Sequence, residues 1–146
     1  MSAAPNEQTP VNLDSANRRL ADVFAPWVQQ LKLSIELIEN DSVVIRMPYS
    51  DDLCRSHQMI CGQAMMTLID TCMVFVCYVG QGKYSNCTTV SQNTSFMRPV
   101  MGRDILATGR VIKSGRSLVF GEVTLRAEDD ERPVCVGTST YMMLPD

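Results

Sequence analysis

One uninterrupted apolar stretch, residues 59–79, constrains the fold of this 146-residue chain more than any other feature. It contains no proline and a single early glycine, Gly62, so it predicts one long helix. About 20 apolar residues suffice to cross a bilayer. Asp70, however, lies at the centre of the stretch, where inserting a charged residue into a membrane costs about 3 kcal/mol. Three further polar residues add to that cost: Gln63, Thr67 and Thr71. We therefore expect a deeply buried helix of a soluble domain, and no membrane partner.

Strand patterns flank this helix on both sides. Residues 31–37 and 43–47 alternate apolar with polar side chains around a turn at Asn40-Asp41, which predicts two half-buried strands. Four more strand-like segments follow the helix, at 86–98, 103–113, 117–127 and 133–144. We expect these four to follow one another as hairpins. The whole pattern predicts an α+β domain, in which an antiparallel sheet packs against one central helix.

The N-terminal residues divide into a tail and a short helix. Residues 1–12 are polar and contain two prolines, so we expect a flexible tail before a single domain formed by residues 13–146. Residues 14–29 predict a helix capped by Asp14 or Ser15. Its apolar face would carry Leu20, Val23, Phe24 and Trp27.

Charge and cysteine usage exclude several functions. The net charge of −3 argues against a protein that binds nucleic acid through its phosphates. The six cysteines form no CxxC motif, and the single histidine cannot complete a zinc finger, so we predict no metal site and no redox cofactor. The N-terminus lacks the basic and apolar regions of a secretion signal. We therefore predict reduced thiols in a cytoplasmic protein.

Three segments carry a resemblance to a known family. Residues 61–71 (CGQAMMTLIDT) place an aspartate eight positions after a glycine, residues 89–99 (TVSQNTSFMRP) end in an aromatic residue and then a proline, and residues 113–118 (KSGRSL) read as a turn. In this order, over about residues 30–145, they resemble the acyl-CoA thioesterases of the phenylacetate-pathway type. That family usually has His-Gly-Gly where this chain has Cys61-Gly62-Gln63.

The resemblance implies a hotdog fold, in which a curved antiparallel sheet wraps around one long central helix. It implies hydrolysis of an acyl-CoA to the free acid and CoA, with active sites at a subunit interface of a homodimer or a dimer of dimers. Relatives often have an amide side chain at the position of Arg55 and a hydroxyl near Thr89 or Thr88. In this chain Arg55 could contact substrate or instead hold Asp52, and Thr89 could position water or be an ordinary strand residue.

Asp70 is the residue that we expect to carry the chemistry. It could act as a general base or a nucleophile toward a thioester carbonyl. Alternatively, it could be structural, capping a loop or pairing with an arginine such as Arg98. Gln63 and Thr67 share its helical stripe, which either lines a pocket or faces water at the margin of the sheet.

Gly62 begins the predicted helix, where the first N–H groups lack partners within the helix and can stabilise an oxyanion. The alternative is a plain glycine at a helix start. Gly62 and Asp70 are eight residues apart, or about 12 Å along a helix. One carbonyl cannot contact both groups of one chain, so joint action requires two subunits.

A local excess of basic residues follows the third predicted strand. Residues 98–116 contain five basic residues and one acidic residue, Asp104. The basic side chains could bind the phosphates of CoA, or they could be scattered over the surface. These five are Arg98, Arg103, Arg110, Lys113 and Arg116. Besides Asp70 and Gly62 as catalytic groups, we predict substrate contacts from Arg55, Cys61, Gln63, Thr67, Thr89, Arg98, Lys113 and Arg116.

Two other functions compete with thioester hydrolysis. A hotdog hydratase or dehydratase needs a histidine with its carboxylate, and His57 is the only histidine. The second competing function is that of a non-catalytic protein that binds acyl-CoA. It is open because Cys61 and Gln63 depart from the usual motif of the thioesterases. Four apolar residues of the long helix could be pocket or core: Met65, Met66, Met73 and Phe75. The P-loop, the GxSxG elbow and the GxGxxG fingerprint are all missing from the sequence.

Overall fold

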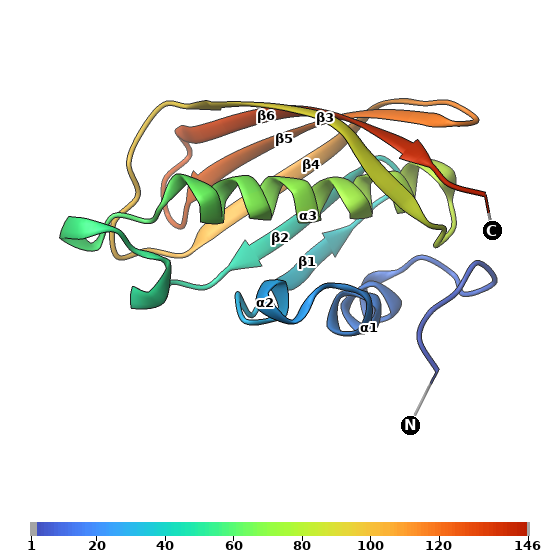
Figure 1. Cartoon of the computed structure of the whole chain (residues 1–146), viewed down its shortest axis with the longest axis horizontal. Coiled ribbons are helices and arrows are strands. Elements are labelled where there is room, and N and C mark those ends of the chain that lie inside the picture. Colours follow the sequence, from blue (N-terminus) through green and yellow to red (C-terminus); the bar gives the residue numbers. More distant parts are fainter. Residues whose placement is uncertain (1–2, 146) are drawn as a thin grey trace.

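The computed structural model describes residues 3–145, and its central element is the long helix α3 (Gly62–Gln81). This helix lies against one face of a six-stranded antiparallel sheet (Figure 1). The strands are β1 (Ser34–Ile38), β2 (Ser42–Met47), β3 (Cys87–Phe96), β4 (Ile105–Ser114), β5 (Leu118–Ala127) and β6 (Pro133–Met143). The predicted α+β class and all six predicted strands are confirmed, with boundaries shifted by a few residues.

The position of β3 differs from the expected succession of hairpins. The strand order in the sheet is β1-β2-β4-β5-β6-β3, so β3 pairs with β6 at the far edge and not with β4. Both edges of β4 are already occupied, by β2 and by β5. β3 instead takes the outer edge of β6, and residues 97–104 carry the chain back across to β4.

The core forms where α3 meets the sheet. By length and composition α3 is apolar enough to cross a membrane, but 61% of its most apolar window is buried inside the domain. The inward face of the sheet carries glycines at the closest approach. A Cβ atom built on Gly109 would lie 2.7 Å from both Cys72 Sγ and Val76 Cγ2. The missing side chain therefore lets helix and sheet pack closely.

The predicted helix over residues 14–29 is in fact two helices, α1 (Leu13–Val23) and α2 (Pro26–Gln29). The break is due to Pro26, because a residue before proline avoids the helical conformation and Ala25 is extended with ψ of 148°. The N-cap is Asn12 and not Asp14 or Ser15: its side chain accepts a hydrogen bond from the Ser15 N–H at 2.9 Å.

The break also turns the expected apolar face. Leu20 is buried and Phe24 partly buried, whereas Val23 and Trp27 are exposed.

Part of the segment expected as a loose tail contacts the domain. Pro5 is buried, and its carbonyl accepts a hydrogen bond from Arg19 Nη1 at 2.8 Å. Glu7 forms an ion pair with Lys83, just after α3, at 3.2 Å. Two short 3₁₀ turns, Asp51–Leu53 and Ser56–Gln58, lead from β2 into α3.

Candidate active site

Asp70 lines a pocket of about 660 Å³ that lies between α3, β3 and the α1–α2 segment. The polar stripe predicted on the helix lines this pocket, since Gln63, Thr67 and Asp70 are all among its walls. Three apolar side chains of the α1–α2 segment close another side: Phe24, Trp27 and Val28. The pocket thus combines one carboxylate with an apolar wall.

A β-bulge in β3 aims further polar side chains at the same pocket. The register of β3 against β6 shifts between Thr89 and Ser91, which leaves one extra residue, Val90, in the strand. Side chains point alternately to the two faces of a sheet along a strand. One inserted residue therefore changes whether the odd-numbered or the even-numbered side chains face the helix. Thr89 lines the pocket before the bulge, and Gln92 and Thr94 line it after the bulge.

Two hydroxyl groups hold the Asp70 carboxylate. Thr89 Oγ1 donates a hydrogen bond to Asp70 Oδ1 at 3.0 Å. The Tyr141 hydroxyl donates to the same Oδ1 atom and also lies 3.0 Å from the Asp70 carbonyl oxygen. Burial, together with the hydrogen bond to Asp70, holds the pKa of Tyr141 well above its usual range. Tyr141 therefore stays a donor at every pH at which the protein would be used.

These contacts remove one form of the structural alternative for Asp70. The pairing with Arg98 is absent, because Arg98 Nη1 instead donates to the Pro133 carbonyl oxygen at 2.6 Å. Among residues 3–145 no arginine or lysine forms an ion pair with Asp70. A partly buried carboxylate without a cation, exposed to an apolar pocket, is available for chemistry.

Tyr141 is the site residue that the sequence analysis missed. A signal was present: apolar and small residues alternate along the last predicted strand, which puts Tyr141 on its inward face with Cys135. A buried tyrosine hydroxyl needs a hydrogen-bond partner. The sequence alone did not say which polar group of the helix would lie opposite.

Gly62 lines a second pocket of about 350 Å³ at the start of the same helix. It is the first residue of α3, and within residues 3–145 its N–H group has no hydrogen-bond acceptor. Arg55 and Arg98 line this pocket, together with Phe96 at the end of β3. Arg55 forms no ion pair with Asp52 in the part of the chain that the structure describes.

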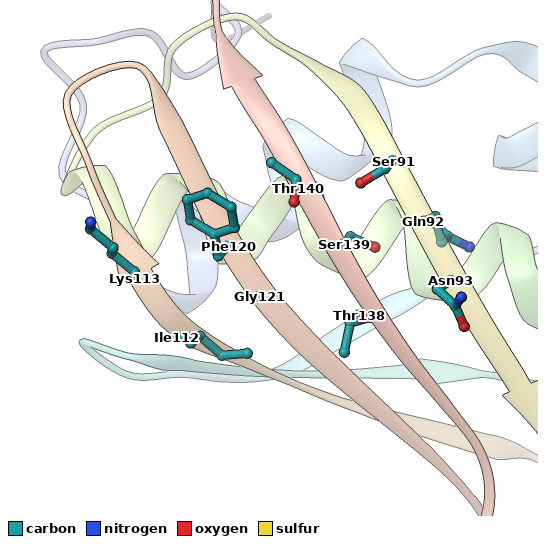
Figure 2. Close-up of a pocket in the computed structure, with 10 residues that line it drawn as sticks. All are labelled: Ser91, Gln92, Asn93, Ile112, Lys113, Phe120, Gly121, Thr138, Ser139 and Thr140. Carbon is teal, nitrogen blue, oxygen red and sulfur yellow. The ribbon is translucent and has the colours of Figure 1, made fainter.

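Three further predicted contacts, Cys61, Thr67 and Lys113, differ in where they lie. Cys61 is the residue before α3 and makes no capping bond with its side chain. Thr67 lines the Asp70 pocket, but its hydroxyl donates back to the Gln63 carbonyl at 2.8 Å. Lys113 borders a hollow of about 790 Å³ on the outer face of the sheet, with Phe120 and Thr140 (Figure 2).

The five basic residues therefore do not form one patch in a single chain. Arg98 and Arg103 lie together at one end of the sheet, while Arg110 pairs with Glu122 at 3.3 Å on β4 and β5. Arg116 occupies the turn between β4 and β5 and is exposed. Only Arg98 of this set borders a pocket that contains a predicted catalytic group.

Two open points of the sequence analysis are settled by burial. Met73 and Phe75 are fully buried core residues, and Met65 is buried beside Gly62. Met66 is exposed and lines the Asp70 pocket. His57 is exposed in the second 3₁₀ turn and borders neither of the two pockets.

Several solved structures are similar to this chain over most of its length. Thioesterase HI1161 from Haemophilus influenzae is 18% identical, with a TM-score of 0.81 and 94% of both chains covered. Zebra fish thioesterase superfamily member 2 is 22% identical, with a TM-score of 0.80 and coverage of 92% of this chain and 99% of that one. The PaaI protein from the phenylacetic acid degradation operon of E. coli is 17% identical, with a TM-score of 0.76 and coverage of 89% and 92%.

These likenesses confirm the predicted hotdog fold. Sequence similarity extends the assignment from fold to family. The family model of the Thioesterase superfamily matches residues 58–134, which is just over half of the chain. The matched range includes the start of α3 with Gly62, the Asp70 carboxylate and the Thr89 hydroxyl that holds it. This chain therefore belongs to the thioesterase superfamily.

Proposed function

We propose that this protein is an acyl-CoA thioesterase whose active site is shared by two subunits. One observation carries the proposal: Asp70 and the unpaired N–H of Gly62 lie on one helix but open into different pockets. Their spacing of eight residues corresponds to about 12 Å along an α-helix. Since one thioester carbonyl cannot span that distance, we assign the two groups of each site to different subunits.

The free edge of β3 offers a way to bring these groups together. In each chain Thr89 lies beside Asp70, and the Phe96 ring lies 3.5 Å from where a Cβ on Gly62 would be. Antiparallel pairing of two β3 strands, centred between Gln92 and Asn93, would set Thr89 of one subunit opposite Phe96 of its partner. Asp70 of one subunit would then face Gly62 of the partner. Such a pairing is a closed twofold interface and also covers an exposed strand edge.

In the proposed reaction, the Gly62 N–H polarises the thioester carbonyl and stabilises the oxyanion that forms on it. Asp70 either takes a proton from the attacking water or attacks the carbonyl carbon itself, giving an anhydride that water then hydrolyses. In both routes water supplies the new C–O bond, the C–S bond breaks, and CoA leaves as its thiol. This chemistry calls for no metal and no redox cofactor.

The two pockets differ in the part of the substrate that they suit. The pocket around Asp70 has an apolar wall formed by Phe24, Trp27 and Val28, which suits the acyl group. The pocket around Gly62 is bordered by Arg55 and Arg98, whose positive charges suit the phosphates of CoA.

The outer face of the sheet supports assembly beyond the dimer. The hollow there is bordered by the exposed side chains of Ile112 and Phe120 (Figure 2). Exposed apolar side chains grouped around a hollow are typical of protein contacts. We assign this face to a second dimer, which would make the protein a dimer of dimers.

Thiol release from a panel of straight-chain and aromatic acyl-CoAs tests the proposed function. For at least one substrate we expect kcat/KM of about 10⁴ M⁻¹s⁻¹ or more, the lower end of the range for evolved enzymes. Calorimetric binding of acyl-CoA without thiol release would instead identify a binding protein. Hydration of an enoyl-CoA without thiol release would identify a hydratase.

A further inference from the structure

The Asp70 carboxylate is held from one side only. Both hydroxyl groups that contact it, those of Thr89 and Tyr141, donate to Oδ1. Within residues 3–145, Oδ2 has no hydrogen-bond partner, although Asp70 lines the pocket. A carboxylate with one oxygen bonded to the protein has its other oxygen free for water or substrate.

The sheet register sets the two donors side by side. Tyr141 on β6 is the direct cross-strand partner of Thr89 on β3, and Val119 on β5 is its partner on the other side. Tyr141 is only 1% exposed, so packing fixes its ring. The bulge at Val90 follows immediately after Thr89. Thr89 therefore still pairs directly with Tyr141, and both side chains point to the helix side of the sheet.

We propose that Tyr141 and Thr89 are positioning residues that fix the Asp70 carboxylate by Oδ1 and leave Oδ2 to act on the thioester. This inference rests on the proposed function. The two donors hold the carboxylate by Oδ1 and prevent its rotation. Their contribution is therefore to the rate of the chemical step and not to substrate affinity.

The test compares Tyr141→Phe and Thr89→Val with wild type and Asp70→Asn. For Tyr141→Phe we expect kcat to fall about 10- to 100-fold, as for other residues that orient a reacting group, with KM nearly unchanged. Thr89→Val should act in the same direction with a smaller effect.

Tyr84→Phe is the matched control. Tyr84 is also 1% exposed. Its hydroxyl shares a 2.7 Å hydrogen bond with Ser15 Oγ of α1 and makes none with Asp70. This variant loses a buried tyrosine hydrogen bond of the same kind, so its thermal melt shows the stability cost alone. We expect its kcat to match that of wild type.

The outcomes separate this inference from the function beneath it. A wild-type protein without thioesterase activity overturns the proposed function and, with it, this inference. An active wild type whose Tyr141→Phe variant keeps its kcat overturns only the inference. If Tyr141→Phe does not fold, Thr89→Val decides: an unchanged kcat in that variant also overturns it.

Discussion

At the scale of single residues, the proposed chemistry depends on how one carboxylate is accommodated on an otherwise apolar helix. Burying a charged group is costly unless hydrogen bonds replace water. For Asp70, the hydroxyls of Thr89 and Tyr141 supply these bonds, and the open pocket supplies the rest of its surroundings. The same arrangement that makes the carboxylate tolerable therefore leaves it able to react.

Replacing Asp70 by asparagine removes the base or nucleophile but keeps the size and an oxygen acceptor for both hydroxyls. We expect turnover to fall on the order of 10²–10⁴-fold while the melting temperature changes little. Initial rates of thiol release and thermal melts measure the two effects. A large loss of stability with normal turnover of the remaining folded protein would show that Asp70 is structural.

Cysteine reactivity gives a second prediction at this scale. Burial raises the pKa of the Cys72 thiol to about 12 and that of Cys135 to about 11. A raised pKa leaves the thiol protonated and unreactive, so at pH 8 we expect at most about one molecule in a thousand to carry either thiolate. Mass spectrometry after brief alkylation should show the partly exposed Cys54, Cys61 and Cys87 labelled first. Early labelling of Cys72 in the folded protein would contradict its place in the core.

At the scale of elements, β3 shows what the sequence predicts and what it does not. Its residue pattern predicts a strand, and the Cys61–Thr71 motif predicts the helix that carries Gly62 and Asp70. The partner strand of β3 depends on which sheet edges other strands have left free, which no local pattern encodes. The bulge at Val90 changes which side chains of β3 face the helix. The pairing of Thr89 with Tyr141, and so their shared contact with Asp70, depends on that register. Long-range pairing, and not residue propensity, therefore completes the site.

Close packing of α3 on the sheet makes Gly109 sensitive to enlargement. A methyl group there would lie 2.7 Å from Cys72 and Val76, two short side chains that cannot move far within the core. We expect Gly109→Ala to lower the free energy of unfolding by about 1–3 kcal/mol. Urea titration measures this value, and Thr108→Ala on the exposed face of the same strand is the control. Equal stabilities for the two variants would argue against the close contact.

The short helix α2 supplies the exposed side of the pocket that we propose for the acyl group. Trp27 is 59% exposed yet lines the pocket with Asp70, so its removal changes the pocket more than the core. For Trp27→Ala we expect KM for the most apolar substrates to rise about tenfold, as burial of a large side chain against a ligand implies, with unfolding free energy unchanged. Ile112→Ala, on the outer face of the sheet, is a matched exposed substitution. Equal KM values for the two variants would remove Trp27 from the substrate site.

At the scale of the whole molecule, the proposed function requires an assembly. One chain places its carboxylate and its free helix N–H in separate pockets and leaves β3 with an open edge. We expect light scattering to give at least twice the 16.3 kDa of one chain. A stable and active monomer would exclude the shared site.

Complementation between two inactive variants tests the shared site most directly. Asp70→Asn removes the carboxylate, and Gly62→Pro removes the N–H at a helix position that tolerates proline. Cys61 is already extended, with ψ of 151°, as a residue before proline requires, and a Cβ at Gly62 makes only ordinary contact with Phe96. Each variant alone should be folded and inactive.

The two chains are unfolded and refolded together in equal amounts, and each variant refolded alone is the control. In a mixed dimer, one site combines Asp70 of the proline variant with Gly62 of the asparagine variant and is intact, while the other site carries both defects. Random pairing makes half of the dimers mixed, so we predict that about a quarter of wild-type activity returns. Well-folded mixed dimers without recovered activity would contradict a site built from two subunits.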